Sequence, residues 1–168
     1  LETNFWGTVK VTNAVLPYFR KQKFGKIITV GSIVGLVSFP NAAYYAASKH
    51  ALEGYFKSLR YELNEFNISI SMIEPAAFKT NILDNSSSTL TKIEDYNTLR
   101  GKIEKFTNDL VEKAEDPALV VGKVLKVVQT DKPEFRNVVG KGTSTLINLQ
   151  HFAYGILEKS ILKQLHKS

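Results

Sequence analysis

The stretch KIITVGS, residues 26–32, decides the fold class, because it joins a short β-branched run to a glycine and a serine. β-branched residues favour strands, and an apolar run without alternation is typical of a strand that is covered on both faces. Two similar runs follow at residues 68–73 and 135–139, and Pro75 and Gly140 close them. Proline cannot donate to a strand ladder, so it marks a strand end. The sequence therefore predicts three short, buried strands.

Helical patterns separate these strands. Apolar residues recur at intervals of three and four over residues 43–65, the clearest helix of the chain, and a similar pattern covers residues 5–18. A helix over 116–128 begins with an aspartate cap and a first-turn proline, and residues 145–167 form a final amphipathic helix. Strands separated by helices need parallel, right-handed crossovers, so the sequence predicts an α/β fold with one parallel sheet.

Residues 76–115 have no single strong period and contain the polar, serine-rich stretch 85–88. Long irregular segments in compact domains are usually functional. We interpret this segment as a mobile excursion over a pocket. The expected layout is a single incomplete catalytic domain over residues 1–168, with a catalytic core in 1–75, a substrate-loop region in 76–115, a last helix and strand in 116–140 and the terminal helix in 145–167.

The composition narrows the classes of function. The 168 residues are 43% hydrophobic and 23% charged, as in ordinary globular proteins, and the absence of cysteine excludes disulfides and cysteine-based zinc sites. The formal charge of +6 comes from 22 basic residues scattered among 16 acidic ones, which argues against nucleic-acid binding. His50, His151 and His166 have no ligand spacing, so no metal site is expected. No stretch approaches the roughly 20 apolar residues that span a bilayer, and a cytoplasmic location is expected.

Residues 45–49, YAASK, place a tyrosine and a lysine four positions apart at the start of a predicted helix, so both side chains emerge on one face. An ammonium group beside a phenol favours the phenolate, and the pair could exchange a proton with an alcohol or carbonyl oxygen. Tyr44 is a rival for this role, but Lys49 lies five positions from it. A surface Tyr–Lys pair has the same spacing as Tyr45 and Lys49, so the motif alone does not decide the function.

Ser32 directly follows the first predicted strand, at the carboxyl edge where open α/β sheets bind ligands. It precedes Tyr45 by thirteen positions, and Asn4 precedes it by twenty-eight. In order and spacing, Asn4, Ser32, Tyr45 and Lys49 resemble the Asn, Ser and Tyr-xxx-Lys pattern of the short-chain dehydrogenase/reductase family. The resemblance implies a partial Rossmann-like, doubly wound parallel sheet that comprises the last three strands and their flanking helices, with a C-terminal helical extension.

The resemblance also implies a reaction and a role for each residue. A hydride would pass between a nicotinamide cofactor, NAD or NADP, and an alcohol or ketone, while Tyr45 exchanges the proton on the substrate oxygen. Ser32 would hydrogen-bond that oxygen. Lys49 would contact the nicotinamide ribose and lower the pKa of the tyrosine, and Asn4 would hold a water that links Lys49 to solvent.

Residues 73–80, IEPAAFKT, resemble the Pro-Gly-xxx-Thr segment of the same family, with Ala76 where the family usually has glycine. The resemblance implies that Pro75, Ala76, Phe78 and Thr80 lie near the cofactor, together with Tyr45 and Lys49. Pro75 could equally be a simple strand terminator. The family's glycine-rich phosphate turn has no counterpart in the sequence, so this chain is expected to be a fragment that is inactive on its own.

Two alternatives concern surfaces. The resemblance implies a homo-oligomer through the helix that carries Tyr45. This helix has small residues suited to close helix pairing, which also fits a non-catalytic interaction or dimerisation module: Ala46, Ala47, Ser48, Ala51, Gly54 and Ser58. The terminal helix could rest on an anionic membrane, although closing the substrate pocket is the favoured interpretation. Apolar residues in the loop and tail indicate a lipophilic alcohol or carbonyl substrate: Phe78, Ile82, Leu83 and Phe152.

Overall fold

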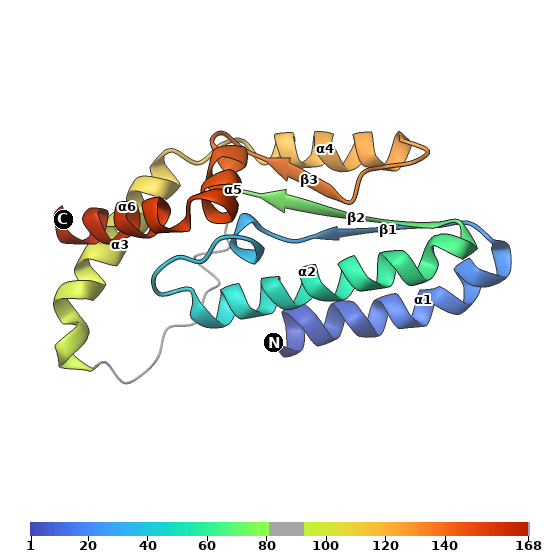
Figure 1. The fold of residues 1–168 in the computed structure, drawn as a ribbon, viewed down its shortest axis with the longest axis horizontal. Helices are drawn as coiled ribbons and strands as arrows, with labels where there is room; N and C mark the ends of the chain where they lie inside the picture. The colour runs from blue at the N-terminus through green and yellow to red at the C-terminus, as the bar shows by residue number, and fades with distance from the viewer. Residues whose placement is uncertain (81–92, 168) are drawn as a thin grey trace.

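The computed structural model of the protein describes residues 1–80 and 93–167. Three parallel strands form one sheet in the order β1-β2-β3, and their carboxyl ends point to the same side of the molecule (Figure 1). The strands are β1 (Gly25–Val30), β2 (Ile68–Pro75) and β3 (Arg136–Val139). The predicted α/β class and all three predicted strands are confirmed, with ends that differ by at most two residues.

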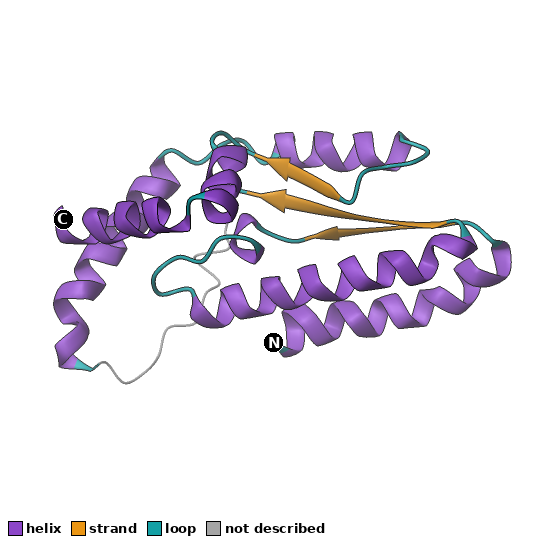
Figure 2. Ribbon diagram, viewed as in Figure 1, coloured by secondary structure: helices purple, strands orange, loops and turns teal. Residues whose placement is uncertain are grey.

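Helices cover both faces of the sheet (Figure 2). On one face lie α1 (Thr8–Gln22) and α2 (Ala43–Leu63), and on the other lies α4 (Ala118–Gln129). A six-residue π-helical turn, Glu2–Gly7, leads into α1. The α4 helix begins at Ala118, after Pro117, and the Ala118 amide donates to Asp116 Oδ1 at 2.8 Å.

The core follows the alternation of β2. Ile70 and Met72 face α2, where they pack with Leu52, Phe56, Leu59, Leu63, Ile68 and Phe135. Ile73 faces the opposite way and packs with Val127 of α4 and Val139 of β3. Because β2 is buried on both faces, its position is determined from both sides, and the polar residues at its carboxyl end are held by a rigid element.

Three further helices gather at the carboxyl ends of the strands: α3 (Asn97–Glu112), α5 (Thr143–Phe152) and α6 (Tyr154–Lys167). Residues 97–112 of the expected excursion form a helix of 16 residues, none of which is fully buried. Residues 85–88, together with Ile82 and Leu83, lie outside the described residues.

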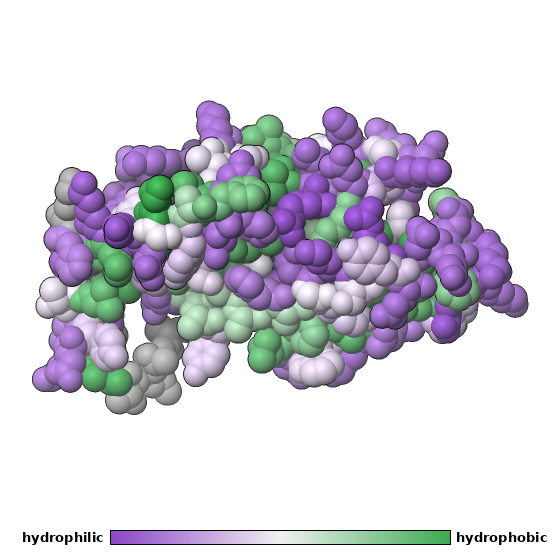
Figure 3. Space-filling model, in the orientation of Figure 1, coloured by the Kyte–Doolittle hydropathy of each residue, from purple (hydrophilic) through white to green (hydrophobic). Residues whose placement is uncertain are grey.

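The terminal region also differs from the prediction, because it forms two helices instead of one. The helix breaks at Ala153, which has φ −148° and ψ 44°. The break leaves Phe152 85% exposed, and Ile156 is also exposed, whereas Leu157 is buried. The prediction of a single helix over residues 145–167 is therefore wrong. Figure 3 shows hydrophobic residues exposed among hydrophilic ones over this end of the molecule.

Among residues 1–80 and 93–167, no helix combines the length and hydropathy needed to cross a membrane.

Candidate active site at the carboxyl edge of β1

Ser32 stands two residues beyond the end of β1, at the carboxyl edge of the sheet. The Gly31 amide still continues the ladder by donating to the Ile73 carbonyl at 2.7 Å. Ser32 is buried and extended, and its Oγ accepts a hydrogen bond from the Val34 amide at 3.2 Å. This bond caps the short 3₁₀ turn Ile33–Gly35. The hydroxyl is therefore fixed at the strand end by the turn that follows it.

Tyr45 and Lys49 lie on the first two turns of α2. The Lys49 Nζ atom lies 5.7 Å from the centroid of the Tyr45 ring, and it donates to the Val30 carbonyl at 3.3 Å. The amine thus connects the phenol to the last residue of β1, immediately before the Gly31-Ser32 corner. Sequence spacing predicted that the two side chains share a face, and the structure brings them together on the side of α2 that faces this strand end.

The turn after Ser32 packs directly against the backbone of Lys49. A Cβ atom added to Gly35 would lie 3.0 Å from the Lys49 carbonyl oxygen and 3.3 Å from the Lys49 Cβ. A side chain at this position would push the turn away from α2. Gly35 therefore sets the close approach of the Ser32 turn to the helix that carries Tyr45 and Lys49. Sequence reasoning missed this glycine, because a lone glycine after a strand has many explanations.

Burial lowers the pKa of the Lys49 ammonium below its usual range. Within the described residues, no carboxylate forms an ion pair with Lys49. An ammonium group has three N–H donors, and a carbonyl and a ring face are poor compensation for a partly buried charge. Lys49 is therefore a cation with donors to spare at the strand end.

Tyr44, the rival phenol, is 91% exposed and has no part in this arrangement. Tyr45, by contrast, is half-buried beside Lys49. One residue of difference on a helix rotates a side chain by about 100°, which is enough to turn the neighbouring ring into solvent. The structure favours Tyr45 as the partner of Lys49.

Asn4 lies in the π-helical turn before α1 and reaches the same helix, but not the lysine itself. Its Nδ2 donates to Ser48 Oγ at 3.2 Å, and Ser48 Oγ donates to the Tyr45 carbonyl at 2.7 Å. Ser48 is almost fully buried. Sequence reasoning treated Ser48 as one of several small residues and missed this link, because its burial depends on the packing of residues 2–7 against α2.

The segment after β2 is held on two sides. The Ala76 amide donates to the Val139 carbonyl at 2.9 Å, and Phe78 pairs with Glu115 through two backbone bonds: Lys79 amide to Glu115 carbonyl at 3.0 Å and Glu115 amide to Ala77 carbonyl at 3.3 Å. Pro75 is the last residue of β2, and Thr80 is exposed. The four residues expected near a cofactor thus lie at the same edge of the sheet as Ser32.

Alanine at position 76 fits the backbone that it occupies. Ala76 does not have a positive φ, so it needs no glycine. Its methyl group instead packs where a side chain of Gly140 would lie: Gly140 has φ +117°, and an added Cβ would come within 2.7 Å of the Ala76 Cβ. Glycine is required at 140 and not at 76.

Glu115 is a third residue that sequence reasoning missed. Its carboxylate accepts a hydrogen bond from the Lys141 amide at 2.7 Å, in addition to the backbone bonds with the segment after β2. Glu115 thus joins the loops that follow β2 and β3. Nothing in the local sequence distinguishes this glutamate from other surface acids.

Among the residues that the structure describes, no group of three or more His, Cys, Asp or Glu side chains could hold a metal ion.

Comparison with known proteins identifies the family. The family model described as short chain dehydrogenase matches residues 1–91. The chain belongs to that family. The three strands of the structure and their flanking helices correspond to part of the family's Rossmann-like sheet.

Known relatives are oxidoreductases. The chain is 37% identical to an uncharacterized oxidoreductase, YusZ, of Bacillus subtilis, over 98% of this chain and 61% of the relative. It is 38% identical to 3-ketodihydrosphingosine reductase of Bacteroides thetaiotaomicron, over 83% of this chain and 53% of that protein. The chain thus spans between half and two thirds of the length of these relatives.

Solved structures of short-chain dehydrogenases share the fold. One from Streptomyces avermitilis superposes with a TM-score of 0.72 at 24% identity, over 98% of this chain and 59% of the other. One from Burkholderia cenocepacia, in complex with NADP, gives 0.71 at 19% identity, over 96% and 56%. One from Burkholderia phymatum, in complex with NAD, gives 0.72 at 17% identity, over 92% and 57%.

Proposed function

We propose that the protein is an NAD(P)-dependent oxidoreductase that transfers a hydride between the nicotinamide and an alcohol or ketone, with Tyr45 as acid and base. One observation carries the proposal. The Lys49 amine lies beside the Tyr45 ring and bonds the Val30 carbonyl, so that a phenol and an ammonium group share the strand end that carries the Ser32 hydroxyl.

Tyr45 would give a proton to the carbonyl oxygen of a ketone, or take one from an alcohol. A positioned phenol can do this when its ionised form is stabilised, and a nearby cation stabilises it. Lys49 supplies that cation at 5.7 Å from the ring. Ser32 Oγ already accepts a bond from the Val34 amide, so the hydrogen of its hydroxyl is available to hold the substrate oxygen.

Lys49 also fits a cofactor. Its spare donors, without a carboxylate partner among the described residues, suit the hydroxyl oxygens of a nicotinamide ribose. When bound, the nicotinamide would supply or accept the hydride. Pro75, Ala76, Phe78 and Thr80 would line the side of the cofactor that faces β2, and Glu115 would hold that segment in place.

Asn4 would act through α2. Its bond to Ser48, and that of Ser48 to the Tyr45 carbonyl, fix the first turn of the helix. The water that links Lys49 to solvent would bind near Asn4, which would keep the amine in proton exchange with bulk water.

We further propose a lipophilic substrate, either NAD or NADP as cofactor, and a cytoplasmic location. The name of the Bacteroides relative, a 3-ketodihydrosphingosine reductase, supports an apolar ketone, as does the half-buried Phe78 beside the sheet edge. The solved neighbours carry NADP in one case and NAD in another, which supports both cofactors equally. The proposal concerns the whole protein, since the chain spans 61% and 53% of the length of these two relatives.

A second candidate function is a non-catalytic interaction module that pairs copies of the protein through α2. Part of the predicted pairing face supports it, because Ala47, Gly54 and Ser58 are exposed. Ala46 and Ser48 are buried within the chain, so the prediction is wrong for these two residues. A homo-oligomer through α2 is compatible with catalysis, so the two candidates differ in turnover and not in assembly. Contact of α6 with a membrane is less favoured than a role at the pocket.

The test is Tyr45→Phe in the native polypeptide, assayed for turnover with either nicotinamide and for cofactor binding by fluorescence. We expect turnover to fall by about 10⁴-fold, the upper range for a positioned acid or base, and cofactor affinity to change by less than about threefold, since the variant removes one hydroxyl. Tyr44→Phe, the matched control, should keep wild-type turnover. Activity retained in Tyr45→Phe would refute the assignment, and a wild-type protein without turnover would favour the interaction module.

A further inference from the structure

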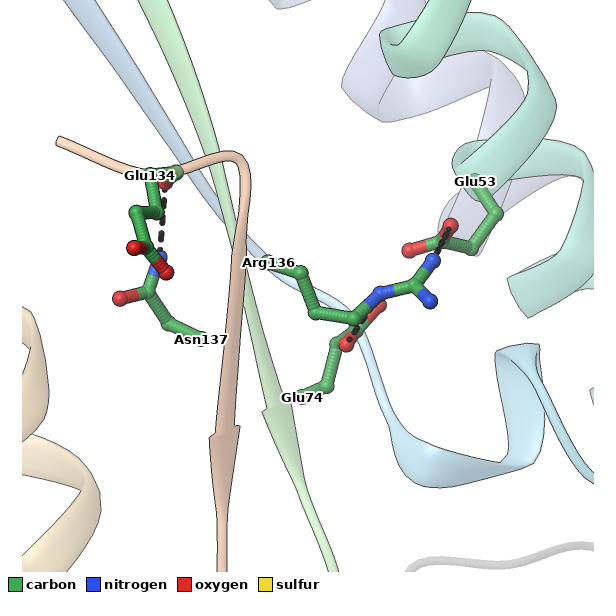
Figure 4. A network of polar contacts seen from close by, with 5 residues as sticks. All are labelled: Glu53, Glu74, Glu134, Arg136 and Asn137. Atoms are coloured by element: carbon green, nitrogen blue, oxygen red, sulfur yellow. Dashed lines mark hydrogen bonds and ion pairs between the residues drawn. The ribbon is translucent and has the colours of Figure 1, made fainter. Parts of the chain in front are cut away.

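Charged side chains from three different elements meet next to the candidate site. Glu53 comes from α2, Glu74 from β2 and Arg136 from β3, and Figure 4 shows the guanidinium between the two carboxyl groups. Arg136 Nη2 donates to Glu53 Oε2 at 2.7 Å. Arg136 Nε lies 3.2 Å from Glu74 Oε2, an ion-pair distance without hydrogen-bond geometry. Two carboxyl groups therefore share one guanidinium group.

The cluster is enclosed by protein. Glu74 is 0% exposed and Glu53 is 8% exposed, whereas the Arg136 side chain keeps 31% of its surface. Glu53 Oε1 and both oxygens of Glu74 have no hydrogen-bond donor among the described residues. A buried carboxylate without a donor is expensive, and two carboxyl groups can hydrogen-bond each other only if one of them carries a proton. Charge counting therefore favours one proton, one anion and one cation, with a net charge of zero.

The cluster adjoins Lys49 by two routes. Along α2, Tyr45, Lys49 and Glu53 are spaced by four residues, so they occupy successive turns of one face. Across the sheet, a Cβ added to Gly31 would lie 3.8 Å from Glu74 Cγ, and the preceding residue provides the carbonyl that binds Lys49. A charge on the cluster would act on the lysine and, through it, on the phenol.

Resting on the proposed function, we propose that Glu53, Glu74 and Arg136 form a positioning network for Lys49. The two carboxyl groups of this network hold one proton between them, so that the network places no net charge beside Lys49. The three residues also tie α2 to β2 and β3, and this fixes the height of the lysine above the strand end. They act through Lys49 and touch neither substrate nor cofactor.

The surroundings support the stored proton. Burial, followed by hydrogen bonding to Glu53 and by its charge, raises the pKa of Glu74 to about 9, while Arg136 opposes the rise. The charged side chains of α2 other than Lys49 and Glu53 are exposed: His50, Lys57, Arg60 and Glu62. Lys26 of β1 binds the Val128 and Thr130 carbonyls at the opposite end of the strand. In the described part of the chain, Arg136 is the cation that pairs with both acids.

The experiment changes the net charge of the network in both directions in the native polypeptide. Arg136→Gln should leave one negative charge, and the double variant Glu53→Gln with Glu74→Gln should leave one positive charge. We measure the pH midpoint of alcohol oxidation. It should rise by about one pH unit in the first variant and fall by about one in the second, as expected for a unit charge about two helical turns from Tyr45 in protein.

Three variants keep the network neutral and serve as controls. Glu74→Gln preserves the Glu53–Arg136 pair, Glu53→Gln lets Glu74 ionise beside the arginine, and Arg136→Lys keeps the cation. Each should shift the midpoint by less than about 0.3 pH units. If the network were only structural, the variants would lower thermal stability or kcat, and their pH midpoints would not follow the net charge of the network.

The proposal is overturned if the positive and negative variants have the same midpoint while Tyr45→Phe is inactive. Should Arg136→Gln fail to fold, the double variant and Glu74→Gln alone still decide, because a shared midpoint would overturn the proposal. Retained turnover in Tyr45→Phe, or none in the wild type, would refute the proposed function first and the network's role with it.

Discussion

The carboxyl ends of β1 and β2 lie side by side, and α2 covers both. The side chains at the end of β1 have an excess of positive charge, whereas those at the end of β2 have an excess of acidic groups. At the end of β1, Lys49 is a cation with no acid to pair with among the described residues. At β2, Glu53 and Glu74 are two acids with one guanidinium. The first imbalance lies beside a phenol and a serine and can be satisfied by a ligand. The second is enclosed and can be satisfied by a proton. Position along one sheet edge therefore separates a binding role from a supporting role.

Removing the lysine would break the comparison most severely. We expect Lys49→Met in the native polypeptide to lower kcat by about 10²–10⁴-fold, the usual contribution of a positioned acid–base system. Cofactor affinity should fall as well, because the donors for the ribose are lost. Steady-state kinetics and a binding titration would measure both. Lys57→Met, an exposed lysine two turns further along α2, should leave both unchanged, and an equal loss in that control would contradict a specific role for Lys49.

Removing the arginine should destabilise the fold. Arg136→Met leaves two buried acids without their cation, and breaking a buried pair in this way costs about 3 kcal/mol in the free energy of unfolding, at the low end for such pairs because Arg136 keeps some exposure. Chemical denaturation at pH 7 would measure it. Arg20→Met, on the exposed side of α1, should cost less than about 0.5 kcal/mol. A loss in Arg136→Met no larger than this control would show that the pair does not stabilise the fold.

The pH dependence of stability sharpens the contrast at β2. The pKa of Glu74 is raised from 4.5 to about 9 in the folded state, so the folded protein holds a proton that the unfolded chain releases. Its contribution to stability is complete below pH 4.5 and is lost as the pH rises toward 9. The loss can reach about 1.4 kcal/mol per pH unit. Glu74→Gln should remove this slope, so that the variant gains stability relative to wild type as the pH increases.

Denaturation midpoints at several pH values between 5 and 9 would test this, with Glu65→Gln as an exposed control that keeps the wild-type slope. Parallel curves for wild type and Glu74→Gln would mean that Glu74 is ionised in the folded protein.

The smallest effect is expected at Ser48. Ser48→Ala removes the link between Asn4 and the Tyr45 carbonyl and should cost about 1 kcal/mol of stability, with a modest fall in kcat. Ser58→Ala, an exposed serine on the same helix, is the matched control. Identical stability in the two variants would mean that Asn4 is held without Ser48.

Much of this organisation could be predicted from the sequence. The strand at residues 68–75 is buried on both faces and the strand at residues 25–30 is partly buried, so their apolar runs stand out. The four-residue spacing of Tyr45 and Lys49 fixes their common face. The position of Ser32 at a strand end follows from the same pattern. Local spacing was sufficient wherever a single element determines the geometry.

The rest depends on contacts between distant segments. The α3 helix has no fully buried residue, and no proline marks the break at Ala153. The pairing of Glu53 with Arg136 joins residues 83 positions apart. Neither charge differs in sequence from an ordinary surface residue, so only the packing of α2 on the sheet reveals the network.

The central claim is that Ser32 and Tyr45 hold the same substrate oxygen, and a double-mutant cycle tests it most directly. Ser32→Ala, Tyr45→Phe and the combined variant would be compared in kcat/KM in the native polypeptide. Groups that act as a unit give strongly non-additive losses, so the double variant should be no more than about threefold slower than the slower single variant. Losses that multiply would mean that the two hydroxyls act on separate atoms, and would contradict the account.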